Sequence, residues 1–196
     1  SILKKACRQA RDWMAAGLSP VKMAVNISPR QFQAGLADQI SSVLKETGLA
    51  PSLLEIEITE TLIIQDVDTS VRIMRAIKQM GVSLALDDFG IGYSCLGMLK
   101  TFPLSCMKID RSFLTHLPAK TKDSAIVSIM IQLAGSLGID VIAEGVETAE
   151  QADFLRAAGC PYGQGYYFGR PVAAGEIEGM LKAMSTFATG SSSQPL

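Results

Sequence analysis

The stretch VSLALDDFGIG, residues 82–92, decides the fold prediction for the whole chain. Its apolar first half predicts a buried β-strand over 82–87. The strand ends in two adjacent carboxylates, Asp87 and Asp88, and runs into a loop that contains Gly90. Carboxylates hold divalent cations in proteins, and glycine-rich turns leave room for phosphates. The stretch therefore predicts a strand with a metal-dependent phosphoester site at its end.

Strand-like and helix-like patterns alternate on both sides of this stretch. Further strands are predicted at 22–27, 53–59, 105–110, 139–144 and 162–168. Apolar residues at helical spacing predict helices at 1–16, 36–48, 66–80, 93–101, 122–138, 148–158 and 175–184. The helix at 122–138 is apolar on most sides and is expected to be heavily buried. Such alternation predicts a parallel sheet with helices outside it.

Six strand–helix units joined by right-handed crossovers either wind an open sheet or close a barrel. An eight-unit barrel of the (β/α)8 TIM-barrel type typically takes ~250 residues, so a chain of this length has room for about six units. Because the first element is a helix rather than a strand, such an α/β barrel would be truncated at its N-terminus. The barrel domain is expected over 1–186, followed by a flexible tail over 187–196 that is rich in serine and glycine.

Composition narrows the functional classes. The hydrophobic content of 48% is enough for one sizeable core, and 18 basic against 19 acidic residues give no electrostatic footprint for duplex nucleic acid. No apolar run approaches the roughly 18 residues of a membrane span, and no secretion signal is visible. The four cysteines form no CxxC pair, which favours buried thiols in a reducing compartment. We expect a cytoplasmic location, with a membrane anchor elsewhere in the parent protein left open.

Polar side chains recur where the predicted strands end. The carboxyl ends of parallel strands share one rim, so these side chains are expected to lie close together in space. The candidates are Asn26, Glu57, Glu60, Asp87, Asp88, Lys108, Asp110, Glu144 and Gln164. One polar residue at a strand end means little, but the recurrence along the chain indicates an active site.

The residue types at this rim favour divalent-metal chemistry. Mg²⁺ and Mn²⁺ prefer carboxylate, amide and water oxygens, and no cluster of cysteine and histidine competes for zinc. The predicted metal ligands are Asn26, Glu57, Asp87 and Asp88. Two cations that share Asp87 would clamp the attacking and leaving oxygens of a displacement at phosphorus. Lys108 adds positive charge for a phosphate or a metal-bound hydroxide, and Glu144 is a candidate general base.

Several candidates also fit purely structural roles. Glu55 has the same side-chain parity as Glu57, so periodicity does not exclude it as the ligand. Lys108 equally fits a buried structural ion pair. Glu60 and Asp110 both stand where helix caps occur.

Six ordered motifs resemble the EAL-domain family: VNIS (25–28), EITE (57–60), DDFGIGYSCL (87–96), KID (108–110), AEGVET (143–148) and QGYYFGRP (164–171). Members of this family hydrolyse cyclic di-GMP to the linear dinucleotide pGpG in bacteria. The resemblance runs from residue 1 to about 184. It implies a modified (β/α)8 barrel with two Mg²⁺ or Mn²⁺ ions, commonly a homodimer, in parent proteins that carry sensory or GGDEF-type domains.

The resemblance also implies roles for the metal and catalytic residues. Those that look like metal ligands are Asn26, Glu57 and Asp87, with Asp88 for the second metal. Lys108 resembles the residue that holds the metal-bound water. Glu144 resembles the catalytic base or a ligand of the second metal, and Gln164 resembles a residue that positions water.

The resemblance also implies roles for residues in and around the loop at 89–96 and for residues that bind the substrate. Glu60 resembles the acid that braces this loop, which in the family couples metal binding to dimer contacts. Ile91 and Cys95 stand where the family more often shows threonine and serine, and this departure bears on loop order and regulation. Asp110 and Gly90 are expected to contribute to substrate binding.

The Glu-Ala-Leu segment that names the family, whose glutamate is a metal ligand, does not occur in this sequence. Losing ligand support commonly weakens a metal site 10–100-fold, so we expect weak activity or none from this piece alone. The expected function is a cyclic di-GMP-specific phosphodiesterase domain that works by a two-metal mechanism. The alternative is a catalytically inactive cyclic di-GMP receptor or protein-interaction module.

Overall fold

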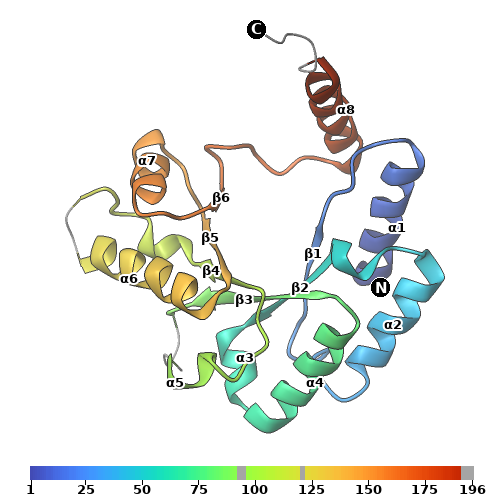
Figure 1. The fold of residues 1–196 in the computed structure, drawn as a ribbon, viewed down its shortest axis with the longest axis horizontal. Helices are drawn as coiled ribbons and strands as arrows, with labels where there is room; N and C mark the ends of the chain where they lie inside the picture. Colours follow the sequence, from blue (N-terminus) through green and yellow to red (C-terminus); the bar gives the residue numbers. More distant parts are fainter. Residues whose placement is uncertain (92–95, 120–121, 191–196) are drawn as a thin grey trace, which may run out of the picture.

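A single parallel sheet organises the molecule, for which a computed structural model describes residues 1–91, 96–119 and 122–190. Its strands follow one another in sequence order: β1 (Met23–Asn26), β2 (Leu54–Thr59), β3 (Ser83–Phe89), β4 (Cys106–Ile109), β5 (Asp140–Glu144) and β6 (Tyr162–Gln164). Every neighbouring pair is parallel, so all the carboxyl ends meet at one rim. The sheet curls into a half-barrel (Figure 1).

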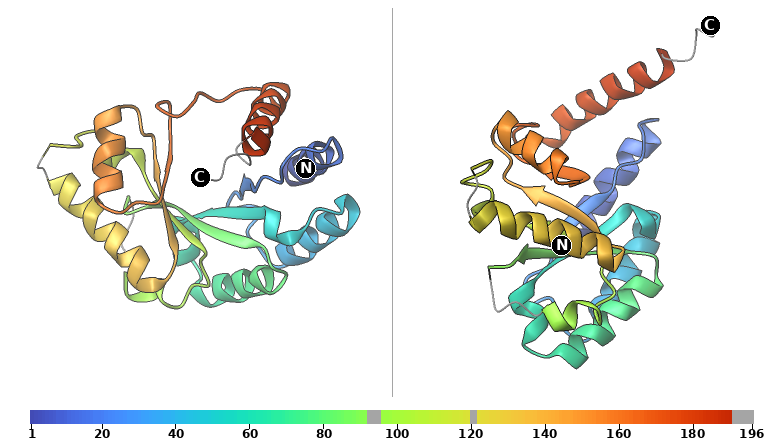
Figure 2. Two further views of the ribbon diagram at one scale, coloured as in Figure 1. Left: turned by 45° about the horizontal axis from the view of Figure 1, so that its top comes forward. Right: turned by 60° about the vertical axis from the view of Figure 1, so that its left-hand side comes forward.

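Helices alternate with the strands and surround the curled sheet (Figure 2). They are α1 (Ile2–Ala15), α2 (Leu36–Thr47), α3 (Glu60–Ile64), α4 (Val67–Gln79), α5 (Leu96–Leu99), α6 (Lys122–Leu137), α7 (Ala149–Ala157) and α8 (Ala174–Gly190), with the short 3-10 turns η1 (Pro51–Leu53) and η2 (Arg111–Phe113). The expectation of about six strand–helix units of a TIM-barrel-like α/β fold is confirmed.

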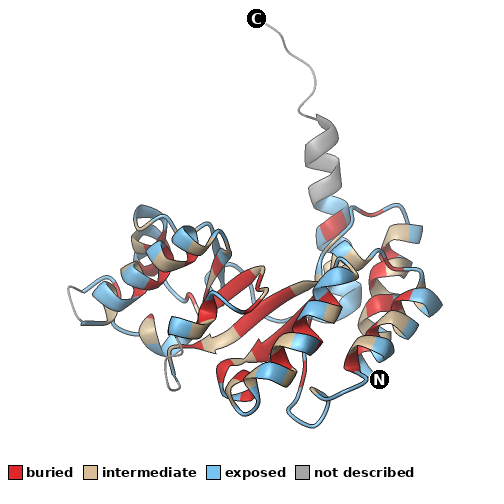
Figure 3. Ribbon diagram, turned by 60° about the horizontal axis from the view of Figure 1, so that its bottom comes forward, coloured by how far each residue is buried: buried red, intermediate tan, exposed pale blue. Residues whose placement is uncertain are grey.

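The core lies between the sheet and its helices because each strand alternates. In β2, Leu54, Ile56 and Ile58 are fully buried, and in α4 Met74 and Ile77 are equally inaccessible to solvent. Strand side chains point alternately to opposite faces, so the residues between these apolar positions face the inside of the half-barrel. Figure 3 shows the buried residues concentrated along the strands and the sheet-facing sides of the helices. The inner face is therefore left for polar chemistry.

The end of β6 and the region before α4 differ from the sequence prediction. The last strand, β6, ends at Gln164 rather than at 168, because the chain then turns and the Phe168 amide donates to the Gly165 carbonyl at 3.0 Å. The short helix α3 precedes α4 and was not predicted. The two helices are separate because Asp66 caps α4, its side chain accepting from the Thr69 amide.

At the C-terminus, α8 continues to Gly190, beyond residue 187 where the tail was predicted to begin. Residues 191–196 lie outside the described residues. The division into a domain and a tail stays a prediction.

The helix predicted at 122–138 is less buried than its composition suggested. Val127 and Ala134 of α6 are fully buried, but Ile129 is 62% exposed and Ile126 is 38% exposed. The expectation of heavy burial is therefore wrong for one side of α6. The helix predicted at 93–101 corresponds in part to α5, and residues 92–95 lie outside the described residues.

The capping box predicted at the start of α7 is confirmed. The Thr148 hydroxyl accepts from the Gln151 amide and the Gln151 side chain accepts in return from Thr148, which makes a capping box at α7. Among the described residues, Cys7 and Cys106 are buried free thiols and Cys160 is a half-buried one. Within the same described ranges, the helices are all too short or too polar to span a bilayer.

Candidate active site

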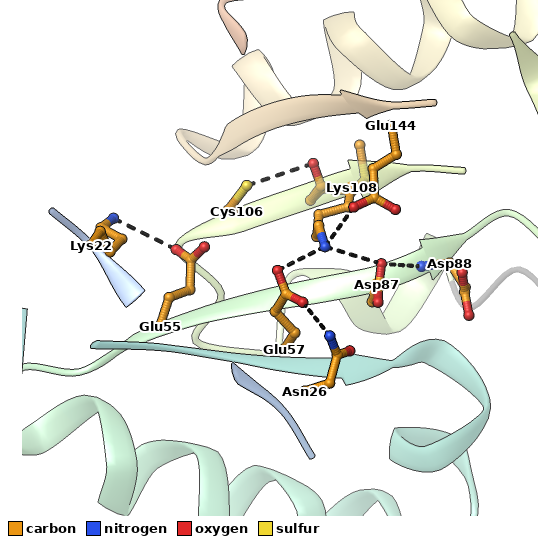
Figure 4. Close-up of polar contacts among 10 residues, drawn as sticks. Lys22, Asn26, Glu55, Glu57, Asp87, Asp88, Cys106, Lys108 and Glu144 are labelled. Carbon is orange, nitrogen blue, oxygen red and sulfur yellow. Dashed lines mark hydrogen bonds and ion pairs between the residues drawn. The ribbon is translucent and has the colours of Figure 1, made fainter. Parts of the chain in front are cut away.

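Lys108 lies at the centre of the candidate site. From β4 its Nζ reaches Glu57 Oε1 on β2 at 2.7 Å and Glu144 Oε1 on β5 at 2.6 Å. Asp87 Oδ1 on β3 lies 3.5 Å away from the same nitrogen. Side chains from four consecutive strands thus meet on the inner face (Figure 4). The structure brings these four candidates together across 88 positions of sequence because the sheet is parallel throughout.

Asn26 extends the cluster to β1. Its Nδ2 donates to Glu57 Oε2 at 2.7 Å, so the two oxygens of Glu57 face Asn26 and Lys108. Glu55 has the same parity but contacts Lys22 at 3.6 Å, away from the cluster. The structure therefore places Glu57, rather than Glu55, among the candidate ligands.

An irregularity in β3 presents both of its carboxylates. The pairing of β3 with β4 shifts register between Leu86 and Phe89, and Asp88 has φ 55°, the one positive φ of a non-glycine residue in the described part of the chain. The Asp88 amide donates to Asp87 Oδ1 at 3.1 Å. A bulge of this kind re-aims side chains near a barrel rim. It allows consecutive residues to contribute to the same site.

Glu60 and Gly90 tie the loop after β3 to the start of α3. The Gly90 amide donates to Glu60 Oε2 at 3.2 Å, and Glu60 is only 4% exposed. Gly90 has φ 94°, and a Cβ at this position would collide with Met130 and approach Phe113 at 3.1 Å. The position therefore requires glycine for backbone and packing reasons, whatever its part in substrate binding.

Asp110 and Gln164 occupy the same rim without joining the Lys108 cluster. Asp110 Oδ1 accepts from the Ser112 amide at 2.8 Å and caps η2, which is the structural role that its sequence position allowed. Gln164 pairs with Glu144 in the β5–β6 register, and its side chain is exposed. Both residues are thus placed at the mouth of the half-barrel.

Negative charge is in excess at the rim. Burial favours the neutral amine of Lys108, but hydrogen bonds and charges from Glu144 and Glu57 outweigh it and raise its pKa. Burial raises the pKa of Glu144 despite Lys108, and burial together with the charges of Asp87 and Asp110 raises that of Asp88. One ammonium thus faces more carboxylates than it can neutralise, and a cation would relieve the repulsion.

The donor set fits a divalent cation with oxygen ligands. Carboxylates of Glu57, Asp87 and Glu144 and the amide of Asn26 are hard donors of the kind that Mg²⁺, Mn²⁺ and Ca²⁺ take. Lys108 lies between these donors. In the described ranges, their present arrangement brings no three acidic, histidine or cysteine side chains close enough together to hold an ion. Binding would require the carboxylates to exchange Lys108 contacts for metal contacts.

Two cavities beside the cluster involve residues that sequence reasoning missed. One of about 430 Å³ is lined by Arg111, Ser112, Thr115, Gly145, Glu147 and Gln151. A second of about 180 Å³ shares Arg111, Gly145 and Glu147 with it and adds Gly165 and Tyr166. Arg111 follows the candidate Asp110 directly, and Glu147 comes three residues after the candidate Glu144. Their position just after the KID and AEG segments is the sequence signal that could have identified them.

A family model described as the EAL domain matches residues 1–171. The phosphodiesterase NbdA of Pseudomonas aeruginosa is 39% identical over 183 residues, which are 93% of this chain and 23% of NbdA. The bifunctional diguanylate cyclase/cyclic di-GMP phosphodiesterase MucR of the same organism is 42% identical over 177 residues, which are 90% of this chain and 26% of MucR. The chain thus spans about a quarter of the length of these relatives.

Solved structures agree with the same family. The MucR phosphodiesterase in complex with cyclic di-GMP has a TM-score of 0.85 at 42% identity, over 90% of this chain and 72% of that one. The EAL domain of DcpA from Mycobacterium smegmatis has a TM-score of 0.89 at 36% identity, over 93% and 82%. BlrP1 of Klebsiella pneumoniae, solved with manganese and cyclic di-GMP, has a TM-score of 0.79 at 31% identity, over 87% and 43%.

Proposed function

Because the chain belongs to the EAL domain family, we propose that it serves as a cyclic di-GMP-specific phosphodiesterase domain that forms linear pGpG. The observation that carries this proposal is the convergence of Glu57, Asp87 and Glu144 on Lys108 at one rim. The relatives named above are phosphodiesterases, and two of the solved structures hold cyclic di-GMP.

The role proposed for each residue follows from its position at the rim. Asn26, Glu57, Asp87 and Asp88 would hold two divalent cations, Mg²⁺ or Mn²⁺. When bound, these cations would activate water and stabilise the charge that develops on the phosphate and leaving oxygen. Lys108 keeps its proton and orients the attacking water, while Glu144 accepts the proton that this water loses. Gln164, at the mouth, positions the water from the β6 side.

Substrate recognition would involve the residues around this centre. Glu60 accepts a hydrogen bond from the Gly90 amide, and Gly90 would take part in substrate binding. Asp110 keeps η2 in place, so that Arg111 at the cavity edge can meet a phosphate. Glu147 lines the same cavities and offers a carboxylate to the N–H edge of a guanine base.

The parent protein and its assembly complete the proposal. The named relatives are about four times longer than this chain, so sensory or GGDEF-type domains would accompany it in a parent protein whose EAL domain lies in the cytoplasm, with a membrane anchor elsewhere left open. A homodimer would use the exposed apolar side of α6, which carries Ile126 and Ile129. Light scattering of the purified chain over a concentration series tests this pairing, and a variant with Ile129→Lys should remain monomeric.

The test of function combines binding and turnover. Titration calorimetry with cyclic di-GMP in Ca²⁺, which we expect to permit binding while slowing hydrolysis, should show binding that EDTA abolishes. Linear pGpG should form only slowly in Mn²⁺, as expected for a piece without the Glu-Ala-Leu segment, and should be lost in Glu57→Gln, whereas Asp153→Asn on the exposed face of α7 should leave the rate unchanged. Binding that persists in EDTA, without turnover in Mn²⁺, would instead favour a non-catalytic receptor.

A further inference from the structure

Two segments that follow different strands face each other across the larger cavity. One wall is the segment after β4, which contributes Arg111, and the other is the loop after β5, which contributes Gly145 and Glu147. The two segments approach closely at Gly145, where an added Cβ would overlap the side chain of Arg111. The separation of the charged groups on the two walls therefore depends on the contacts that hold these segments together.

Gln151 joins the two walls through its side-chain amide. Its Oε1 accepts from the Glu147 amide at 2.7 Å and from the Thr148 amide at 3.2 Å, just before α7 begins. Its Nε2 donates to the Leu114 carbonyl at 2.9 Å. Leu114 directly follows η2, and its own amide donates to the Arg111 carbonyl at 2.9 Å. One side chain thus ties the backbone beside η2 to the backbone of the opposite wall.

Capping of α7 alone does not require glutamine at this position. Either glutamate or glutamine completes a capping box, because both offer an oxygen to the amide at the N-cap. Only glutamine can also donate to a carbonyl, and an ionised carboxylate would repel the Leu114 carbonyl at a position that is 7% exposed. The Leu114 carbonyl also accepts from the Leu117 amide at 3.1 Å. The bond from Gln151 therefore holds the segment in place rather than pairing an otherwise unpaired carbonyl.

We infer that Gln151 is a positioning residue that sets the separation of Arg111 and Glu147, and with it the affinity for cyclic di-GMP. The inference deepens the proposed phosphodiesterase function and rests on it, since Arg111 is proposed to meet a phosphate and Glu147 a guanine base. Both lie outside the cluster of side chains around Lys108. Their displacement should weaken binding of substrate and transition state equally, so that KM rises and kcat does not change.

The test compares two variants that separate bridging from capping. Gln151→Glu keeps the oxygen that caps α7 but loses the donor to Leu114, whereas Thr148→Ala loses the capping hydroxyl and keeps that donor. The assay is run at about pH 8.5, far above the ordinary pKa of a glutamate. In Mn²⁺ the KM of Gln151→Glu for cyclic di-GMP should rise about 10-fold, as for the loss of about one substrate contact, with kcat within about 2-fold of the wild type. Thr148→Ala should change neither constant by more than about 2-fold, because the bridge remains.

Hydrogen exchange of the metal-free protein tests the bridge without any ligand. The peptide 111–117 contains the amides of Leu114 and Leu117 and should exchange several-fold faster in Gln151→Glu than in the wild type. The same peptide should be unchanged in Thr148→Ala, and β2 and β3 should be unchanged in both variants. Gln151→Met keeps the side-chain length without a charge, and it should reproduce the faster exchange and the higher KM if the charged variant folds poorly.

A matched control and two outcomes decide the inference. Gln39→Glu makes the same substitution at an exposed position in the first turn of α2 and should leave exchange, KM and kcat at the wild-type values. Equal effects of Gln151→Glu and Thr148→Ala would reduce Gln151 to a helix cap and overturn the inference. Unchanged exchange in 111–117 or an unchanged KM in Gln151→Glu would overturn it as well. If the wild type neither binds nor hydrolyses cyclic di-GMP, the proposed function fails, while exchange in 111–117 still decides whether Gln151 holds the two walls together.

Discussion

Lys108 shows how one buried charge can organise a site. It is 4% exposed and contacts three carboxylates, of which Glu57 and Glu144 are within 2.7 Å. Removing one member of a buried ion pair typically costs about 3–5 kcal/mol, because the remaining charge is left without a partner. A divalent cation is the natural replacement for the missing ammonium. The stability of this site is therefore coupled to its metal.

Lys108→Met tests that coupling. We expect the melting temperature of the metal-free protein to fall by about 6 °C or more, given about 2–4 °C per kcal/mol for a chain of this size. Mn²⁺ should then raise the melting temperature more than in the wild type, while cyclic di-GMP turnover is lost. Differential scanning fluorimetry with and without Mn²⁺ measures both shifts. If Mn²⁺ raises the melting temperature of Lys108→Met no more than that of the wild type, the proposed coupling between Lys108 and the metal is wrong.

Cys106 gives a second prediction at the residue scale. Burial, followed by the charges of Glu55 and Asp140, raises the pKa of its thiol to about 12. At pH 8 only about 1 in 10⁴ of these thiols is ionised, and the thiolate is the reactive form. Cys106 should therefore resist maleimide in the native protein and react fully after denaturation, as read by peptide mass spectrometry. Rapid labelling of Cys106 under native conditions would show that β4 opens.

Residue patterns alone left one ambiguity that only packing resolves. Glu55 and Glu57 alternate identically, so the sequence predicts two inward carboxylates and cannot say which one joins the site. The structure separates them by their partners, since Lys22 lies near Glu55 and Lys108 near Glu57. Those partners depend on how the strands are staggered in the curled sheet. That stagger is a tertiary property absent from any single strand's pattern.

At the scale of elements, the end of β6 depends on a close backbone approach. The Val146 amide donates to the Gln164 carbonyl at 3.0 Å, and the Val146 carbonyl accepts from the Tyr167 amide at 3.0 Å. Gly165 sits between these bonds with φ 156°, and a Cβ there would overlap the Val146 backbone. The requirement for glycine explains why the strand stops at Gln164.

Gly165→Ala should displace this turn. We expect a loss of about 1–3 kcal/mol in unfolding free energy from overpacking against backbone that cannot move aside. Cyclic di-GMP turnover should fall more than stability suggests, because Gln164 moves with the turn. Gly169→Ala is the matched control, since a Cβ at Gly169 meets no atom within 4 Å. Urea unfolding and pGpG formation measure the two effects, and similar behaviour of both variants would exclude the backbone explanation.

Predictions of helices and strands succeeded where neighbouring residues in the sequence determine the structure. They failed where contacts with distant parts of the chain determine it. The capping box at Thr148 is local, and the structure contains it. The burial of α6 depends on what covers each side, and its apolar composition did not reveal that Ile129 would be 62% exposed. The short helix α3 begins at Glu60, whose carboxylate accepts from Gly90 thirty residues away. Such long-range contacts are not encoded in a local window.

At the scale of the molecule, parallel topology is what made the site predictable. Once the strands were read as parallel, their carboxyl ends had to share a rim, and residues from Asn26 to Gln164 could be expected together. The cavities that involve Arg111 and Glu147 depend instead on loop paths after β4 and β5. Loop geometry follows from packing of the whole fold, so the sequence identified the cluster on the strands better than the surfaces around it.

Cation and substrate should stabilise the whole molecule together, because both are proposed to bind the same rim. A ligand at 100 times its dissociation constant stabilises the folded state by about 2.7 kcal/mol, which corresponds to about 5–10 °C at this chain length. We expect a shift of this size for Ca²⁺ with cyclic di-GMP and a much smaller one for cyclic di-GMP alone. Asp87→Asn should abolish the extra shift seen when both ligands are present, while still folding, because Lys108 keeps its shorter contacts with Glu57 and Glu144. The prediction fails if, in the wild type and in Asp87→Asn alike, the shift in melting temperature with both ligands equals the sum of the shifts with Ca²⁺ alone and with cyclic di-GMP alone. The two ligands would then bind at separate sites.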